Sequence, residues 1–165
     1  KLLDKNVENH KSLAVLILDI DHFKNVNDTH GHDVGDQILK IFAERLKGNL
    51  RSFDMVARMG GEEFVVVLPD VSDDRPYMVA ERLRLAIAKT PIPCSTPEGH
   101  LSITTSIGGT ILSPENISAE EAIKRADLEL YEAKKNHGRN CSVFEGMGKL
   151  DPDQFKPRGR PELEE

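Results

Sequence analysis

Two groups of carboxylates stand beside strand-like apolar segments. Asp19 and Asp21 end the first segment, and Glu62 and Glu63 follow Gly60-Gly61 between two others. A carboxylate ending a buried strand is destabilising unless it is paired. Either a basic side chain or a metal ion must therefore balance Asp19. Adjacent glutamates at a tight turn repel each other, and a divalent cation relieves that repulsion.

If the first apolar segment lies beside the Gly-Gly turn in one sheet, Asp19 and Glu62 converge. Oxygen ligands without Cys or His favour Mg²⁺ or Mn²⁺ over zinc, and the glycines let the backbone approach a bulky ligand. Two plainer interpretations stay open. Asp19 can cap the helix that follows it, and the Gly-Gly-Glu-Glu stretch can be an ordinary exposed hairpin.

The apolar pattern predicts the elements that position these carboxylates. Residues 13–20 form a continuous apolar run, which is typical of a strand covered on both faces. Gly60-Gly61 joins two further strands as a hairpin, and Ser118 with Glu121 forms a capping box. The predicted strands are 13–20, 54–59, 63–68, 101–112 and 140–144. The predicted helices are 21–30, 33–50, 72–89 and 118–136, with a turn at 30–35.

This order of elements predicts an α+β fold, broadly ferredoxin-like, with a mostly antiparallel central sheet flanked by helices. A doubly wound parallel sheet fits worse because of the hairpin. We expect residues 1–12 to be the end of a preceding helix or a linker, and residues 13–145 to be one catalytic domain. Residues 146–165 are rich in Pro, Gly and charge, which predicts a disordered tail.

The composition is that of an ordinary globular domain. The 165 residues are 38% hydrophobic and 30% charged, with a net charge of −6. Basic residues are scattered among acidic ones, which argues against a nucleic-acid partner. No apolar run reaches the roughly 20 residues of a membrane helix, so we expect no membrane contact for this segment. Cys94 and Cys141 make neither a disulfide framework nor a zinc quartet, which indicates a reduced, cytoplasmic location.

Four ordered stretches resemble the GGDEF family of diguanylate cyclases. The first contains Asp19-Ile-Asp21-His-Phe23-Lys24, Asn27-Asp28, Gly31-His32 and Gly35-Asp36. The others are Arg58-x-Gly60-Gly61-Glu62-Glu63-Phe64, Arg125-Ala-Asp127 with Tyr131-x-Ala-Lys134, and Gly138-Arg139-Asn140. The match spans residues 13–145 in order. It is a GGEEF variant, with Glu62 where Asp is usual, and resembles the response-regulator type, in which a receiver or other sensor domain precedes the cyclase.

The resemblance implies a cyclase-palm fold and an enzyme that condenses two GTP into cyclic di-GMP and two pyrophosphates, as a homodimer. It implies a Mg²⁺ or Mn²⁺ site made by Asp19, the backbone carbonyl of Ile20, Glu62 and Glu63. The ions bridge the triphosphate and stabilise charge on the leaving pyrophosphate. Glu62 is also implied as the base for the 3′-hydroxyl, although a carboxylate bound to Mg²⁺ is a poor base.

Asn27 and Asp36 match the family's guanine readers. A carboxylate accepts hydrogen bonds from N1 and the N2 amine of guanine, a donor pair that adenine lacks. From the residues alone, Asp36 is equally an ordinary acid in the first turn of a helix. The other implied substrate contacts are the helix-opening backbone at Phe23 and Lys24, and then His32, Gly61, Lys134 and Arg139.

Arg51-Ser-Phe-Asp54 matches the family's inhibitory RxxD motif, separated from Gly60 by five residues. Arg82, on the following predicted helix, matches a helper of that motif. The resemblance implies that cyclic di-GMP binds there as product and inhibits the enzyme.

The sequence departs from the family pattern at one further point, and two alternative functions remain to be considered. The family's Asp-x-Leu-Thr-Gly-Leu-x-Asn-Arg-Arg pattern does not occur, so we expect the sequence to start inside the family's first helix. The main alternative is a catalytically silent GGDEF domain that senses GTP or cyclic di-GMP, but the carboxylates whose loss marks such domains are present. An aspartate-nucleophile phosphatase, indicated by Asp19-x-Asp21, needs a small residue where Phe23 stands. A Walker P-loop is absent.

Overall fold

The computed structural model describes residues 12–113, 115 and 118–156. The elements are β1 (Ser12–Ile20), α2 (Phe23–His30), α3 (His32–Gly48), β2 (Met55–Gly60), β3 (Glu63–Val71), α4 (Arg75–Ala88), β4 (Ile92–Pro93), β5 (His100–Leu101), β6 (Thr105–Leu112), α5 (Ala119–Lys135), β7 (Ser142–Phe144) and β8 (Gly148–Lys149). Residues 1–11 of the linker predicted at 1–12, and residues 157–165 of the predicted tail, lie outside the described residues; Ser12 belongs to β1.

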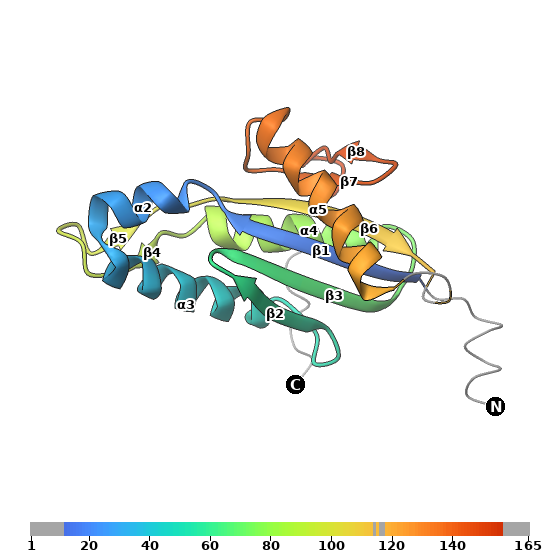
Figure 1. Ribbon diagram of the computed structural model, residues 1–165, viewed down its shortest axis with the longest axis horizontal. Helices are drawn as coiled ribbons and strands as arrows, with labels where there is room; N and C mark the ends of the chain where they lie inside the picture. Colours follow the sequence, from blue (N-terminus) through green and yellow to red (C-terminus); the bar gives the residue numbers. More distant parts are fainter. Residues whose placement is uncertain (1–11, 114, 116–117, 157–165) are drawn as a thin grey trace.

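The central sheet has six strands in the order β2-β3-β1-β6-β7-β8. Every neighbouring pair is antiparallel except β6 and β7, which are parallel. β4 and β5 form a separate two-stranded sheet. The prediction of an α+β fold with a mostly antiparallel sheet is confirmed, and so is the hairpin between β2 and β3 (Figure 1).

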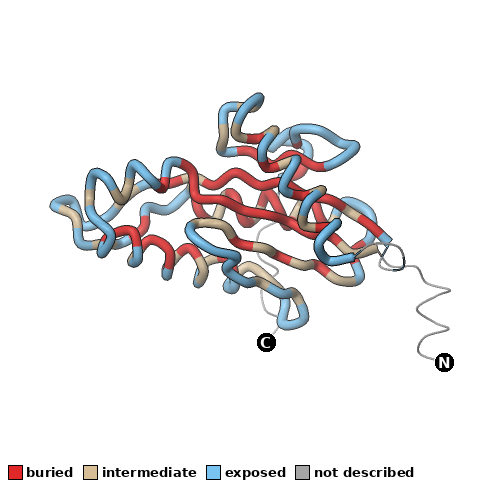
Figure 2. Tube along the Cα trace, in the orientation of Figure 1, coloured by how far each residue is buried: buried red, intermediate tan, exposed pale blue. Residues whose placement is uncertain are grey.

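Helices cover both faces of the sheet, which explains the continuous apolar run of β1. Side chains of a strand alternate between its faces. Leu16 and Leu18 belong to the larger core with α3 and α4, whereas Val15 and Ile17 pack with α5. β1 is accordingly buried along most of its length (Figure 2). In the part of the chain that the structure describes, no helix is long and apolar enough to cross a bilayer.

α5 lies directly on β6 because β6 carries a glycine where the two elements meet. A Cβ at Gly108 would come within 2.1 Å of the backbone nitrogen of Leu130 and 2.3 Å of the carbonyl oxygen of Ala126. Any larger residue would push the helix off the sheet. This close contact fixes the course of α5, whose last turn carries Lys134.

Several predicted boundaries differ from those of the structure, and two of the differences are informative. The single strand predicted at 101–112 is interrupted at 102–104, because residues 100–101 pair with β4 in the separate sheet whereas residues 105–112 pair with β1 in the central sheet. The turn predicted at 30–35 is confined to Gly31, with α3 starting at His32. Gly31 has a φ of 87°, which is sufficient to separate α2 from α3.

The predicted disordered tail is wrong for residues 146–156. Leu150 and Phe155 are 2% and 3% exposed and belong to the larger core. The ring of Phe155 lies 5.1 Å, centroid to centroid, from that of Tyr77 on α4. Two large apolar side chains are enough to anchor this short segment, although its average composition is polar.

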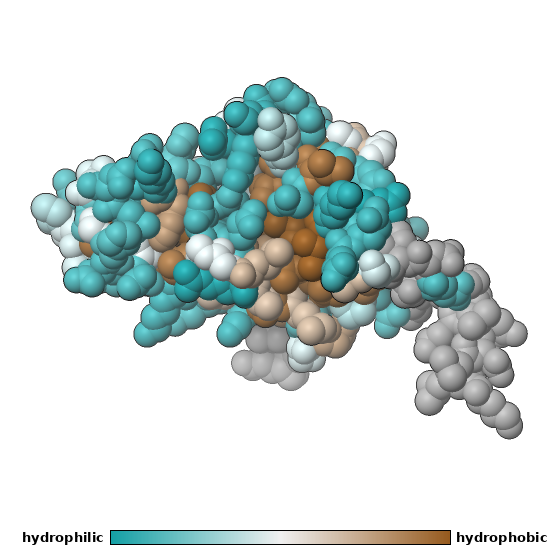
Figure 3. Space-filling model, viewed as in Figure 1, coloured by the Kyte–Doolittle hydropathy of each residue, from teal (hydrophilic) through white to brown (hydrophobic). Residues whose placement is uncertain are grey.

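One face of the sheet also carries an apolar hollow of about 300 Å³ beside α5. Val65 and Val67 of β3, Leu13 of β1 and Ile123 of α5 line it. Apolar side chains surface next to α5 in the space-filling view (Figure 3). The polar groups described next lie elsewhere.

Candidate active site

Asp19 and the two glutamates meet where the end of β1 lies beside the start of β3, at one end of the central strands. Asp19 lies opposite Glu63 in the antiparallel pairing of β1 and β3, and Glu62 precedes Glu63 in the hairpin. Burial raises the pKa of Asp19 to about 6; the hydrogen bond and charge of Lys134 lower it, and the charges of Glu62 and Glu63 raise it further. The pKa of Glu63 is also raised, first by burial and then by Asp127.

A basic side chain balances Asp19. Lys134 of α5 donates a hydrogen bond through Nζ to Asp19 Oδ2. The other oxygen, Oδ1, is buried and has no hydrogen-bond partner among the described residues. Of the two possibilities that the sequence left open for Asp19, the structure shows the ion pair. It also leaves one carboxylate oxygen available to a further ligand.

The carboxylates fit a divalent ion in chemistry, although they are not gathered into a closed site. Within residues 12–113, 115 and 118–156, no three Asp, Glu, His or Cys side chains are close enough to hold a metal ion. The unpaired oxygen of Asp19 and the two neighbouring glutamates are nevertheless hard donors that suit Mg²⁺. The backbone carbonyl of Ile20, also predicted as a metal ligand, directly follows Asp19 in the chain.

Asp21 has a different environment from Asp19. Its carboxylate accepts hydrogen bonds from Ser106 Oγ (2.6 Å), Thr104 Oγ1 (2.6 Å) and the backbone amide of Asn140 (3.1 Å). A carboxylate with three such donors is satisfied by the protein itself. Asp21 therefore holds β1, β6 and the 138–140 turn together. The sequence placed Asp19 and Asp21 in one acidic cluster and gave no sign of this division of roles.

A hollow of about 530 Å³ opens between α3 and β2. Asp36, a predicted guanine reader, lines it together with Lys40 and Arg58, which were not among the predicted site residues. Lys40 follows Asp36 by four residues, so helical spacing alone places both on one face of α3. Arg58 also donates through Nε to the carbonyl of Gly61 (2.8 Å), which steadies the hairpin beside Glu62.

Asn27 reaches α3 through a gap left by a glycine. A Cβ at Gly35 would lie 1.9 Å from Asn27 Oδ1 and 3.3 Å from the ring of Phe23. Oδ1 is buried, and no described residue donates to it. Gly35 precedes Asp36 in the chain, so the two predicted guanine readers lie on adjoining turns of α2 and α3.

The other residues predicted to contact the substrate lie in α2, at the start of α3, in the hairpin and after α5. Phe23 is a core residue, so its backbone rather than its ring is available, while Lys24 is exposed in the first turn of α2. His32 is exposed at the start of α3, and Gly61 is exposed in the hairpin. Arg139 follows α5 in a turn with a left-handed φ of 65°.

A second polar site lies around Asp54. Its Oδ2 accepts from the amide of Arg51 (2.7 Å) and from Nη2 of Arg75 (3.4 Å). Arg51, Arg75 and Arg82 line a hollow of about 420 Å³, together with Asp73 and Asp74. The structure thus brings together the three residues that the RxxD resemblance selected, and it adds Arg75.

This second site contains unsatisfied charge. Asp54 Oδ1, Arg75 Nη1 and Arg82 Nε are buried and have no hydrogen-bond partner in the described part of the chain. Burial lowers the pKa of Arg75, and the neighbouring charge of Arg51 lowers it further. Buried guanidinium N–H groups without partners are suited to an anion. Sequence reasoning missed Arg75 because it lies outside the RxxD motif.

Comparison with known proteins identifies the family. Residues 1–141 match the family described as "Diguanylate cyclase, GGDEF domain". The response regulator PleD of Caulobacter vibrioides is 42% identical over 131 residues, which are 79% of this chain and 29% of PleD. The chain therefore spans less than a third of that relative.

Solved structures agree. The GGDEF domain of DgcB from Caulobacter crescentus, in complex with c-di-GMP, superposes with a TM-score of 0.76 at 29% identity, covering 86% of this chain and 80% of that one. The active GGEEF domain of a diguanylate cyclase from Vibrio cholerae gives a TM-score of 0.74 at 29% identity, covering 86% and 88%. The chain belongs to the diguanylate cyclase GGDEF-domain family.

Proposed function

We propose that the chain condenses two GTP molecules into cyclic di-GMP and two pyrophosphates. One observation carries the proposal: Asp19 aligns with Glu63, next to Glu62, beside a hollow lined by Asp36. In this proposal the carboxylates hold the metal ions that bind the GTP phosphates, and the hollow holds the guanine base. The Vibrio cholerae neighbour, described as an active GGEEF domain, supports Glu62 as a working substitute for Asp.

The metal donors in this proposal are Asp19, the carbonyl of Ile20, Glu62 and Glu63. When bound, Mg²⁺ or Mn²⁺ supplies charge stabilisation for the leaving pyrophosphate. Lys134 and Arg139 add positive charge at the triphosphate, while the amides at Phe23 and Lys24 bind its oxygens at the start of α2. His32 and Gly61 complete the contacts with the nucleotide.

Selection of guanine falls to Asn27 and Asp36. The Asp36 carboxylate accepts from N1 and N2 of guanine, and the unpaired Oδ1 of Asn27 supplies a further acceptor. Adenine lacks this donor pair, so neither the Asp36 carboxylate nor the Asn27 amide oxygen would receive a hydrogen bond from the base if ATP bound. The free-energy cost of leaving these polar groups without hydrogen bonds favours binding of GTP over ATP.

Closing the ring requires two domains. Each domain holds one GTP, and each 3′-hydroxyl attacks the α-phosphorus of the nucleotide held by the other. Two P–O bonds form, two pyrophosphates leave, and each hydroxyl gives up its proton, with Glu62 as the proposed acceptor. The chain is therefore proposed to act as a homodimer in the cytoplasm, controlled by an upstream receiver or sensor domain.

The second polar site is proposed to bind cyclic di-GMP as an inhibitor. Arg51 and Arg82 supply cations and Asp54 supplies an acceptor, as the RxxD resemblance implies. The unpaired guanidinium groups support this role. They also favour the main alternative, a domain that senses cyclic di-GMP without making it, because that function requires only this second site.

One experiment separates these functions. The chain is incubated with GTP and Mg²⁺, and the product is read by mass; Glu62→Gln is run alongside, with Glu98→Gln, an exposed turn residue, as the matched control. Cyclic di-GMP from the unaltered chain and from Glu98→Gln, with a loss of about a hundredfold or more in Glu62→Gln, supports the cyclase. Binding of cyclic di-GMP without synthesis supports the sensor.

A further inference from the structure

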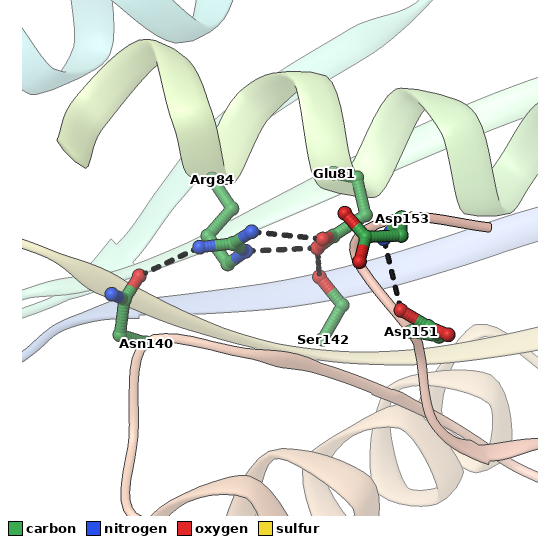
Figure 4. Close-up of polar contacts among 6 residues, drawn as sticks. All are labelled: Glu81, Arg84, Asn140, Ser142, Asp151 and Asp153. Atoms are coloured by element: carbon green, nitrogen blue, oxygen red, sulfur yellow. Dashed lines mark hydrogen bonds and ion pairs between the residues drawn. The ribbon is translucent and has the colours of Figure 1, made fainter. Parts of the chain in front are cut away.

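Helix α4 carries a buried ion pair that neither proposed site uses. Arg84 donates through Nε and Nη2 to the two oxygens of Glu81, at 2.9 Å each, and Ser142 Oγ donates to Glu81 Oε2 at 2.8 Å (Figure 4). Glu81 is 1% exposed and Arg84 is 6% exposed. The separate Asp153–Asp151 hydrogen bond lies nearby and does not join this group.

The third donor of Arg84 points out of the pair toward the 138–140 turn. Its Nη1 donates to Asn140 Oδ1 at 3.0 Å (Figure 4). The backbone amide of Asn140 donates in turn to Asp21 Oδ2 at 3.1 Å. Asn140 is therefore held from two sides, by α4 through its side chain and by the end of β1 through its backbone. Asp21 is two residues beyond Asp19.

The 138–140 turn has a backbone that needs such restraint. Gly138, Arg139 and Asn140 have consecutive left-handed φ values of 71°, 65° and 48°. Glycine adopts this region freely and asparagine tolerates it, but arginine does so at a cost. Strained backbone of this kind persists where surrounding groups hold it, and it concentrates at functional sites. Arg139, the strained residue, is the proposed phosphate ligand.

Stability alone does not account for the ion pair. Well-packed apolar residues of similar volume usually stabilise a core as well as a buried pair does. What an apolar group cannot supply is a directed hydrogen bond to Asn140. The pair fixes Arg84 by two bonds and so holds its third nitrogen, Nη1, in a defined direction.

We infer that Glu81 and Arg84 are positioning residues, which hold the 138–140 turn through Asn140 so that Arg139 is fixed for binding the GTP phosphates. The inference rests on the proposed function. Neither side chain touches substrate; both act through the turn. Removing their hydrogen bond to Asn140 weakens GTP binding and leaves the chemical step nearly unchanged. The contact of Arg139 with the phosphates stabilises the ground state and the transition state equally.

Two variants test this from opposite ends. Asn140→Gly keeps the left-handed backbone accessible and removes the acceptor for Arg84. The triple variant Glu81→Met, Arg84→Met, Ser142→Ala replaces the buried polar group by apolar side chains, so the unfolding midpoint stays within about 5 °C. Asn136→Ala is the matched control, because it loses a side-chain hydrogen bond to Glu132 in the same segment without touching Asp21 or Arg84.

Steady-state kinetics with GTP and Mg²⁺ should show KM raised about tenfold in both test variants, kcat within about twofold, and no change in Asn136→Ala. In an Arg139→Ala background, Asn140→Gly should add almost nothing, because the two act on one contact. Hydrogen exchange at the Asn140 amide should accelerate in the triple variant, and this readout is independent of nucleotide.

Three results overturn the inference: unchanged KM in both variants, equal losses in kcat alone, or full additivity with Arg139→Ala. If the unaltered chain binds GTP without making product, the proposed cyclase function fails while the inference is still decided by the ratio of GTP dissociation constants. If the chain neither binds nor converts GTP, both fail.

Discussion

Lys134 donates a hydrogen bond to Asp19 across 115 positions of sequence, and this ion pair joins the end of α5 to the end of β1. The pair stands next to Glu62 and Glu63, so one lysine faces three carboxylates. The negative charge of these three carboxylates is therefore only partly balanced by the protein. The metal ions of a metal–triphosphate complex would bring the positive charge that this arrangement lacks.

The first prediction concerns pH and stability. Burial raises the pKa of Asp19 from 3.8 to about 6 in the folded chain. Protonation of Asp19 thus favours folding: its contribution is fully present below about pH 4 and is lost as the pH rises through about 6. Replacing Asp19 by Asn removes the buried charge, so Asp19→Asn should raise the free energy of unfolding at pH 8 by about 1 kcal/mol.

Urea unfolding without divalent ions measures this. The gain of Asp19→Asn should shrink toward zero at pH 4, where Asp19 is itself protonated. Asp28→Asn, an exposed change on α2, should stay within about 0.5 kcal/mol at both pH values. A less stable Asp19→Asn at pH 8 would show that the bond to Lys134 outweighs the cost of burial.

The second prediction contrasts two neighbouring lysines. Lys134 bonds to Asp19, whereas Lys135 is exposed and lies over the ring of Tyr131, 5.9 Å from its centroid. Lys134→Gln should lower kcat/KM for GTP about tenfold or more, because a cation is lost beside the phosphates. Lys135→Gln, with the same change of charge, should remain within about twofold. Equal effects of the two variants would show that Lys134 contributes only its net charge and has no specific contact with the phosphates.

The third prediction uses two glycines of α3. Gly35→Ala forces a Cβ against Asn27 Oδ1, only 1.9 Å away, and so displaces a proposed guanine reader. KM for GTP should rise about tenfold, and the preference over ATP should fall. Gly48→Ala is the control, because a Cβ added there would meet no described atom within 4 Å beyond its own chain neighbours and helix backbone, and alanine favours the helix. Normal GTP selectivity in Gly35→Ala would remove Asn27 from the base site.

Local signals explain what the sequence predicts well. The apolar run at 13–20 and the glycine pair at 60–61 specify a strand and a hairpin without reference to distant residues. If those two elements pair with the end of the first strand beside the glycine turn, Asp19 falls close to Glu62 and Glu63. The sequence predicts the convergence on that condition, and the antiparallel register of β1 and β3 meets it.

Long-range pairings explain what the sequence does not predict. The family resemblance implies Lys134 as a phosphate ligand, but nothing in the sequence around it indicates an ion pair with Asp19. Arg75 and Asp54 are 21 residues apart, and only the packing of α4 brings them together. Phe155 was assigned to a disordered tail because average composition hides one well-placed aromatic ring.

The fourth prediction tests that tail. Phe155 is buried against Tyr77, so Phe155→Ala should lower the free energy of unfolding by about 3 kcal/mol. Met147→Ala, in the same segment at a side chain 46% exposed, should change it by less than about 0.5 kcal/mol. Thermal and urea unfolding both measure the difference. A Phe155→Ala chain as stable as the unaltered one would show that Phe155 does not anchor residues 146–156 to the core.

The fifth prediction concerns inhibition by product. Arg82 and Arg75 each have a buried N–H without a partner in the described chain, next to Asp54. Arg82→Ala should raise the cyclic di-GMP concentration for half inhibition about tenfold or more with kcat unchanged, because the site is remote from Asp19 and the hairpin carboxylates. Arg75→Ala should do the same, which distinguishes this chain's site from the RxxD motif alone.

Arg125→Ala is the matched control for both arginines, because it removes a guanidinium from a half-exposed ion pair with Glu145 on another surface. Initial rates of pyrophosphate release at rising cyclic di-GMP give all four curves. Relief of inhibition in Arg82→Ala alone would confine Arg75 to holding Asp54 in place. Undiminished inhibition in both variants would mean that the unpaired guanidinium groups serve another anion, and that product control of this domain lies elsewhere.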